Sequence, residues 1–378
     1  MIANSPDSLT PYKIKENIYL LYGNVGIVIG DDYVLLVDSW LGHYQKNSNQ
    51  ELMDAIKKIT DKPVKYVINT HSHGDHSGGN KYFVEQGATV ITHQNALYSP
   101  YIPKSGQPPH ILRFNKQLHL GIGNERIKIE HIKAHTFDDA LIFLEESNVL
   151  FVGDNLKTNG WVGLGVYGKE SFEHWIDKAL SLMDDKTLVI PGHGITPFNR
   201  EQLISYQQSV NKWINHIMKK HQKGLSAKQI SKDPTSYRLK RKFILDEIDE
   251  QSFNLSYQEY DAEQVSEIIE LEVKPSIQLK ESQLMDYVGS YYFEDKNNID
   301  ILVDNGKLLA KQRDKFFSYL LPISKDTFKM TTTNGDEVLK FHRDSNSAQE
   351  ISGLTPIIPK HSHYRSLITG RWHKIVKD

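Results

Sequence analysis

The stretch Thr70-His-Ser-His-Gly-Asp-His-Ser-Gly-Gly79 places three imidazoles and one carboxylate within six consecutive positions, from His71 to His76. The preceding run, Val64 to Asn69, is apolar enough to predict a buried strand, so the cluster is expected on the loop that leaves the C-terminal end of that strand. Active sites of layered α/β folds gather at such ends. This stretch therefore predicts both a fold class and the position of a functional site.

The residue types in this stretch are those of a metal site. His71 and His73 stand at positions i and i+2, so in an extended backbone their side chains point the same way and can present two ring nitrogens to one ion. Gly74 permits a sharp turn that brings Asp75 and His76 toward a second position. A mixed imidazole and carboxylate set suits Zn²⁺, Fe or Mn²⁺. Because four ligands cannot complete two sites, more are expected downstream.

Composition narrows the class of protein. The chain has 378 residues, which suits two domains of roughly 150 residues as a first expectation. Its 45 basic and 47 acidic residues nearly balance, which argues against nucleic acid or an acidic membrane surface as a partner. The chain contains no cysteine, so disulfides, thiolate ligands and a cysteine nucleophile are all excluded.

The chain shows no targeting or membrane signal. No apolar run approaches the roughly 20 residues that a membrane span needs, and Met1 to Thr10 lack the basic start and apolar stretch of a signal peptide. We therefore expect a soluble, cytoplasmic protein that acts on a small molecule. A periplasmic or secreted location is the alternative if a signal peptide has been replaced by the initial Met, and a chain without cysteine suits that compartment too.

Strand and helix patterns alternate along the first 225 residues, which is typical of an α/β layered domain. An antiparallel meander is expected at Ile14–Leu21, Val25–Ile29 and Tyr33–Val37. Later strands are predicted at 88–92, 127–132, 140–144, 149–152 and 187–190. Helices are predicted at 47–60, 80–86, 171–183 and 201–221. His93 follows one of these strands, and we interpret it as structural.

The run His71-x-His-x-Asp-His76, followed by Gly-Gly, resembles the metal-binding signature of the metallo-β-lactamase superfamily. Matching residue types follow in the expected order, each just past a β-type run: His135, Asp154, and His193 in a Gly-His-Gly turn. The resemblance covers about residues 12 to 225 and implies a four-layer αββα sandwich. We accordingly expect residues 1–225 to form the catalytic domain.

The resemblance also implies roles for these residues. One metal would be held by His71, His73 and His135, and the other by Asp75, His76 and His193, with Asp154 bridging. Two Zn²⁺ per chain are expected, with Fe or Mn as alternatives. A hydroxide shared by the two ions would attack a scissile carbonyl, while Asp75 orients it and passes a proton to the leaving group. Asp38, at a strand end, would support the metal loop.

Such a site predicts hydrolysis of a carboxylic ester, lactone, thioester or amide. The ligands do not select among these four substrates, because the same ligands are shared across substrate classes. The run from His135 to Asp139 also resembles the His-Thr-x-Asp-Asn run of the largest zinc β-lactamase subclass. The later ligand of that subclass is Cys, whereas this chain has Asp154, which favours the arrangement of glyoxalase II-like and lactonase-like relatives. β-Lactamase and phosphodiesterase activities stay as alternatives. Flavo-di-iron redox chemistry is disfavoured because the C-terminal region lacks a flavodoxin-like βα pattern.

The pattern changes after the catalytic domain. Residues 226–277 predict a helical connector, and residues 278–378 a small antiparallel β-barrel or sandwich domain. Asn305-Gly306 and Asn334-Gly335 lie between β-type runs and are typical of tight hairpins. Three roles are open for this domain: covering the groove, binding substrate, or forming a homo-oligomer.

Overall fold

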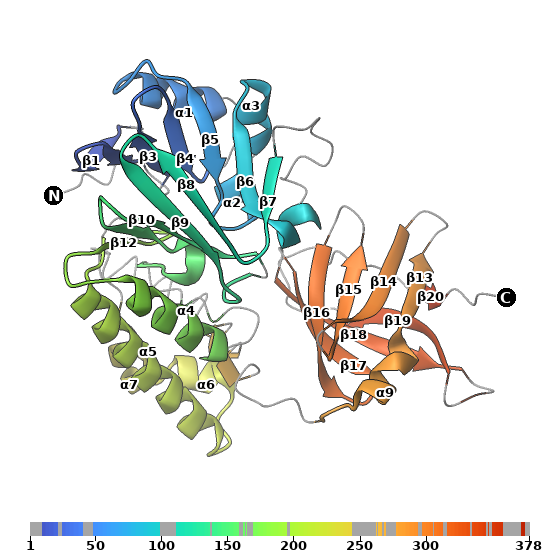
Figure 1. Ribbon diagram of the computed structural model, residues 1–378. Coiled ribbons are helices and arrows are strands. Elements are labelled where there is room, and N and C mark those ends of the chain that lie inside the picture. Colours follow the sequence, from blue (N-terminus) through green and yellow to red (C-terminus); the bar gives the residue numbers. More distant parts are fainter. Residues whose placement is uncertain are drawn as a thin grey trace. The chain divides into compact units, whose positions relative to one another are not determined.

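The computed structural model (Figure 1) forms two compact units, Met1–Ala96 with Tyr101–Glu272, and Leu97–Pro100 with Val273–Asp378. The described residues are 10–21, 25–40, 48–98, 111–136, 138–158, 162, 164, 169–194, 197–243, 262, 264–266, 268–269, 277–293, 297–304, 306–312, 316–332, 335–344, 347, 350–357 and 372–374.

The first unit contains two mixed sheets. The seven-stranded sheet runs in chain order through β1 (Tyr12–Lys15), β2 (Ile18–Leu20), β3 (Gly26–Ile29), β4 (Val34–Val37), β5 (Val64–Ile68), β6 (Thr89–His93) and β7 (Ile111–Phe114). Its first four strands pair antiparallel and the later ones parallel. The expected meander is confirmed, with an additional turn that divides its first run into β1 and β2.

The five-stranded sheet has the order β12-β11-β10-β9-β8, with β8 (Gln117–Ile122), β9 (Glu125–His131), β10 (Ala140–Leu144), β11 (Val149–Phe151) and β12 (Leu188–Ile190). β11 and β12 pair parallel, and the others antiparallel. Helices α1 (Ser48–Lys57) and α3 (Asn80–Glu85) lie beside the first sheet, and α4 (Lys169–Leu182) and α5 (Arg200–His221) beside the second (Figure 1).

The period-2 direction of strand side chains explains the layers. In β4, Leu35 and Val37 face a core shared with β9, β10 and β11 of the second sheet. Val34 and Leu36, on the opposite face, pack with Leu52 of α1 and with α3. The second sheet repeats this arrangement, and its outer face packs on α4 and α5. Strands buried on both faces therefore produce the predicted αββα sandwich.

The helical residues after α5 pack on the same unit. They include α6 (Ala227–Ser231) and α7 (Pro234–Lys240), each with a polar side chain capping its N-terminus. Ile230, Phe243, Val265 and Ile268 are buried in the core that α4 and α5 form on the second sheet. Residues 244–261, 263, 267 and 270–276 of the expected connector lie outside the described residues.

The second unit is a closed antiparallel barrel after a short helix, α9 (Glu281–Leu284). Its strands are β13 (Gly289–Phe293), β14 (Asn297–Asp304), β15 (Lys307–Gln312), β16 (Phe316–Ser324), β17 (Thr327–Thr332), β18 (Gly335–Arg343), β19 (Ile351–Ile357) and β20 (Trp372–Lys374). Pairing of β13 with β20 closes the barrel. The two predicted hairpins join β14 to β15 and β17 to β18, although Asn305 and Asn334 themselves lie outside the described residues.

Candidate metal centre

The ligand-type side chains predicted from the sequence meet at one end of the two sheets of the first unit. His71 and His73 follow β5, and the short helix α2 (Gly74–Ser77) carries Asp75 and His76. His135 lies between β9 and β10. Asp154 lies on the short 3₁₀ helix η2 (Gly153–Asn155), and His193 follows β12. All seven residues therefore lie close together, because each follows a strand that ends at the same side of the sandwich.

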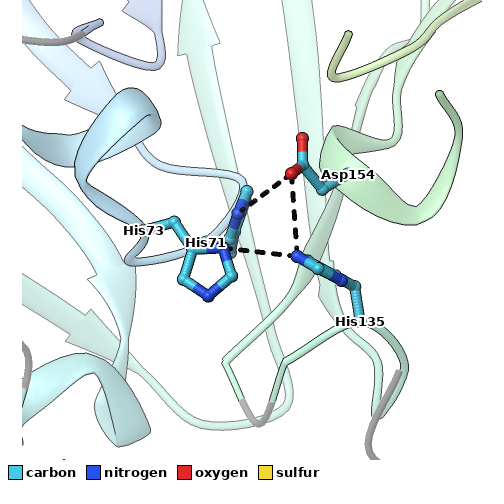
Figure 2. A group of neighbouring side chains, drawn as sticks. All are labelled: His71, His73, His135 and Asp154. Atoms are coloured by element: carbon cyan, nitrogen blue, oxygen red, sulfur yellow. Dashed lines mark hydrogen bonds and ion pairs between the residues drawn. The ribbon is translucent and has the colours of Figure 1, made fainter. Parts of the chain in front are cut away.

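Three of the histidines and Asp154 form the group drawn in Figure 2. The Nε2 atom of His135 lies 3.3 Å from Nδ1 of His73 and 3.6 Å from Oδ2 of Asp154. The Nε2 atom of His71 is 3.9 Å from the same carboxylate oxygen. Four donor atoms thus converge within 4.8 Å of one another. We call this set, His71, His73, His135 and Asp154, the three-histidine group.

A second group consists of Asp75, His76, His193 and the same Asp154. Oδ1 of Asp154 lies 2.9 Å from Nε2 of His76 and 3.2 Å from Nε2 of His193. Asp75 closes the group, with Oδ2 3.1 Å from Nε2 of His193. Asp154 therefore presents one oxygen to each group, and we call this second set the two-histidine group.

The donor atoms fit a metal. Nε2 of His71 is buried and has no hydrogen-bond partner among the described residues. Leaving a buried polar nitrogen unpaired is costly in free energy, so such an atom indicates a missing partner. Imidazole nitrogens and carboxylate oxygens are ligands that Zn²⁺, Fe and Mn²⁺ accept.

The two groups differ in charge without a metal. Burial lowers the pKa of His73 to about 4 and the pKa values of His71 and His135 well below the usual range, so these rings are neutral at pH 7. By contrast, the Asp154 carboxylate raises the pKa of His193 to about 9. A cation that binds at the two-histidine group must therefore displace a proton from His193. At the three-histidine group the imidazole rings are already neutral, so a cation displaces no such proton.

Asp38 supports the loop from beneath. Its Oδ1 accepts a hydrogen bond from the Thr70 backbone N–H at 2.8 Å, and its Oδ2 lies 2.8 Å from both Thr70 Oγ1 and His76 Nδ1. The backbone of Asp38 has φ 65°, in the left-handed region that few residues other than glycine adopt. These contacts confirm the predicted role of Asp38 beneath the loop.

Two residues of the site were not predicted. Nζ of Lys157 lies 3.1 Å from Oδ2 of Asp154, and its side chain is only 13% exposed. Asn155 is buried, and its Oδ1 accepts a hydrogen bond from the backbone N–H of His135. Asn155 ends the one-turn helix η2 and Lys157 follows it, and so short an element has no periodicity to show which side chains point inward.

His93 has a structural role, as predicted. Its ring stacks on that of His131 with centroids 3.6 Å apart, and its Nε2 lies 2.6 Å from the backbone oxygen of Asn115. The stacked pair joins the end of β6 in one sheet to the end of β9 in the other. His93 belongs to neither candidate metal group.

A buried carboxyl beside the site predicts a pH dependence of stability. Burial raises the pKa of Asp138 to about 6, so the folded protein keeps this group protonated at pH values where the unfolded chain has lost the proton. The stabilising contribution is present below about pH 4 and is lost as the pH rises through 6.

We expect the Asp138→Asn variant, which is neutral at every pH, to be more stable than the native chain at pH 7.5. The difference should exceed about 1.4 kcal/mol, the value of one pKa unit, and should shrink toward pH 4.5. Urea unfolding of the metal-free proteins at both pH values measures this difference, with exposed Asp185→Asn as the control. A difference that does not change with pH would contradict the assignment.

Comparison with known proteins identifies the family. The sequence pattern that defines the metallo-beta-lactamase superfamily matches residues 18–193 of this chain. The metallo-beta-lactamase IND-1 of Chryseobacterium indologenes is 30% identical over 198 residues, which cover 48% of this chain and 80% of that relative. The chain belongs to the metallo-beta-lactamase superfamily.

Relatives with other names match as well. A hydroxyacylglutathione hydrolase of Pelagibacter ubique (strain HTCC1062) is 28% identical over 163 residues, which cover 42% of this chain and 64% of that protein. A solved metallo-beta-lactamase from Pontibacter korlensis is 22% identical with a TM-score of 0.45, covering 53% of this chain and 98% of that one. Among the described helices, none combines the length and apolar character that crossing a membrane requires.

Proposed function

We propose that the chain is a hydrolase that uses two metal ions, with zinc as the expected ion, to cleave a carboxylic ester, lactone, thioester or amide bond. The observation that carries this proposal is the pair of four-residue groups that share Asp154. The three-histidine group and the two-histidine group would each hold one ion. When bound, such ions polarise a carbonyl oxygen and lower the pKa of water toward neutrality.

The chain's own residues would divide the remaining work. Asp154 would hold the two groups at a fixed spacing, because its two oxygens face different groups. Asp75 is the only one of the two carboxylates that reaches solvent, with 35% of its side chain exposed against 3% for Asp154. This exposure supports Asp75 as the group that would orient the attacking water and deliver a proton to the leaving group through a carboxylate oxygen.

The substrate is proposed as a small molecule with a hydrolysable carbonyl. Two of the relatives are named metallo-beta-lactamase and hydroxyacylglutathione hydrolase, and both names fall within this class of reaction. β-Lactamase activity is a second candidate because the match to the metallo-beta-lactamase IND-1 covers 80% of that relative. Asp154 in the place of a cysteine ligand favours the non-lactam substrates.

The test is metal content by mass spectrometry on protein purified without chelators, combined with hydrolysis assays. The panel is a chromogenic ester, a lactone, a thioester, a cephalosporin and a phosphodiester. About two zinc ions per chain with turnover of one carbonyl substrate would support the proposal. Two irons would favour redox chemistry, turnover of the phosphodiester alone would favour a phosphodiesterase, and a chain without metal or turnover would contradict a hydrolase.

We expect His73→Ala to lose one of the two ions and to lower turnover by more than about 100-fold, the upper range for groups that only support a ligand. The fold should survive, because His73 lies on a loop and outside the hydrophobic cores. Circular dichroism, metal content and turnover are measured for His73→Ala and for the control variant His119→Ala, which changes an exposed histidine. Native turnover by a His73→Ala protein of reduced metal content would contradict the two-ion mechanism.

A further inference from the structure

Within the described part of the chain, the His135 ring lacks the supporting hydrogen-bond partner that the rings of His71 and His76 have. The second ring nitrogen of His71 lies 3.1 Å from Thr70 Oγ1, and that of His76 lies 2.8 Å from Asp38 Oδ2. The His135 ring instead contacts members of its own group, His71, His73 and Asp154. Among the described residues, no side chain outside the group forms a hydrogen bond with this ring. Its position therefore depends on the backbone that carries it.

That backbone is irregular, and two buried side chains hold it: Asn155 accepts the N–H of His135, and Asp139 accepts the N–H of Thr136 at 2.6 Å. The segment between β9 and β10 has neither helical nor strand structure at this residue. The His135 N–H donates to Oδ1 of Asn155 at 3.0 Å, and Nδ2 of Asn155 donates to the Val152 carbonyl oxygen at 2.8 Å. Asn155 is 1% exposed, so water does not replace either bond without a rearrangement.

The turn that carries Asn155 is itself firmly packed. Gly153 has φ +55°, and a Cβ there would lie 2.8 Å from Cβ and Oγ1 of Thr70 in the metal loop. On its other side, the Gly192 N–H donates to the Gly153 carbonyl oxygen at 2.8 Å. The amide of Asn155 thus extends from a turn that is fixed against both the metal loop and the turn before His193.

We propose that Asn155 is a positioning residue that ties His135 to Asp154, so that these two members of the three-histidine group are held as one unit. The inference rests on the proposed metal centre. Asn155 is the chain neighbour of Asp154 and accepts the His135 N–H, so a shift of one loop is transmitted to the other. Groups that orient metal ligands typically change metal affinity by roughly 10–100-fold when they are removed.

Two substitutions separate the bonds. Asn155→Leu has a similar volume and removes both hydrogen bonds, whereas Asn155→Asp retains an acceptor for the His135 N–H and loses the donor to Val152. Asn211→Leu is the matched control, because it removes an amide that donates to Glu173 Oε1 at 2.7 Å between α5 and α4. Each full-length, metal-free protein is titrated with Co²⁺ while its visible absorption is recorded, and hydrogen exchange of the peptide containing His135 is measured by mass spectrometry.

We expect the native chain to bind two Co²⁺ ions and Asn155→Leu to bind one of them roughly 10–100-fold more weakly, with a changed visible spectrum. The His135 amide should exchange faster in Asn155→Leu and remain protected in Asn155→Asp. Asn211→Leu should match the native chain in both measurements. A role limited to general stability would instead leave Co²⁺ affinity and spectrum unchanged in every folded variant.

The failures are distinguishable. If Asn155→Leu folds with native Co²⁺ affinity and native exchange, the positioning role is wrong while the metal centre stands. If the native chain binds no Co²⁺, the proposed function fails and the positioning role fails with it. If Asn155→Leu does not fold, Asn155→Asp decides, since fast exchange of the His135 amide in that protein would overturn the role of the acceptor.

Discussion

Asp154→Ala is expected to lose both metal ions and to lower turnover by more than His73→Ala does. Asp154 alone contributes an oxygen to each group, 2.9 Å from His76 Nε2 on one side and 3.6 Å from His135 Nε2 on the other. We expect metal affinity to fall by more than about 100-fold at both groups, beyond what loss of a supporting residue causes. Metal titration and turnover on the carbonyl substrate measure this.

A metal-independent measurement accompanies this prediction. The Asp154 carboxylate is the largest cause of the raised pKa of His193, about 9, so in metal-free Asp154→Ala that pKa should fall toward the usual histidine range near 6.5. Titration of the ring followed by NMR reports the change. Asp185→Ala, whose side chain is 98% exposed, is the matched control. An Asp154→Ala protein that retains one tightly bound ion would contradict the prediction that both ions depend on this carboxylate.

Asp38→Ala is expected to destabilise the metal-free fold by about 3–5 kcal/mol, the cost of removing one partner from a buried ion pair. Asp38 is 4% exposed and is the acceptor for the Thr70 N–H, with His76 at its other oxygen. Its loss leaves these donors buried without the acceptor. Because the His76 ring loses its orienting partner, metal affinity should also fall by roughly 10–100-fold.

Chemical unfolding and metal titration of Asp38→Ala test both effects, with exposed Asp32→Ala as the control. Asp38→Asn provides a finer comparison, because it keeps an acceptor for Thr70 but presents an amide to His76. We expect Asp38→Asn to recover part of the stability and less of the metal affinity. If Asp38→Ala matched Asp32→Ala in unfolding free energy, the network beneath the loop would be energetically unimportant.

The sandwich was predictable because each of its signals is local. A strand buried on both faces, such as β4 or β11, appears as a continuous apolar run. The amphipathic spacing of α4 and α5 likewise follows from one buried face. The ligand-type residues were found because each stands just after such a run, where the sheet ends.

The limits of prediction also have physical causes. The sequence left a barrel or a sandwich open for the second unit, and the pairing that closes the barrel joins β13 to β20 across the whole domain. β19 and β20 were not anticipated, because one contains Gly353 and Pro356 and the other has only three residues. Strand partners far apart in the chain leave no periodic trace in either segment.

The sequence by itself determined the ligand types, their order and the layered fold, because a strand end, a glycine turn and a His-x-His spacing are all properties of neighbouring residues. The grouping of these donors around Asp154 was expected from the family resemblance. Only the tertiary structure showed the distances between the donor atoms, and that Asn155 reaches the backbone of His135. His73 and His135 are 62 positions apart in the chain, yet their ring nitrogens lie at 3.3 Å. Such distances arise only when two sheets pack face to face, since burial of the apolar core between them sets where their ends meet.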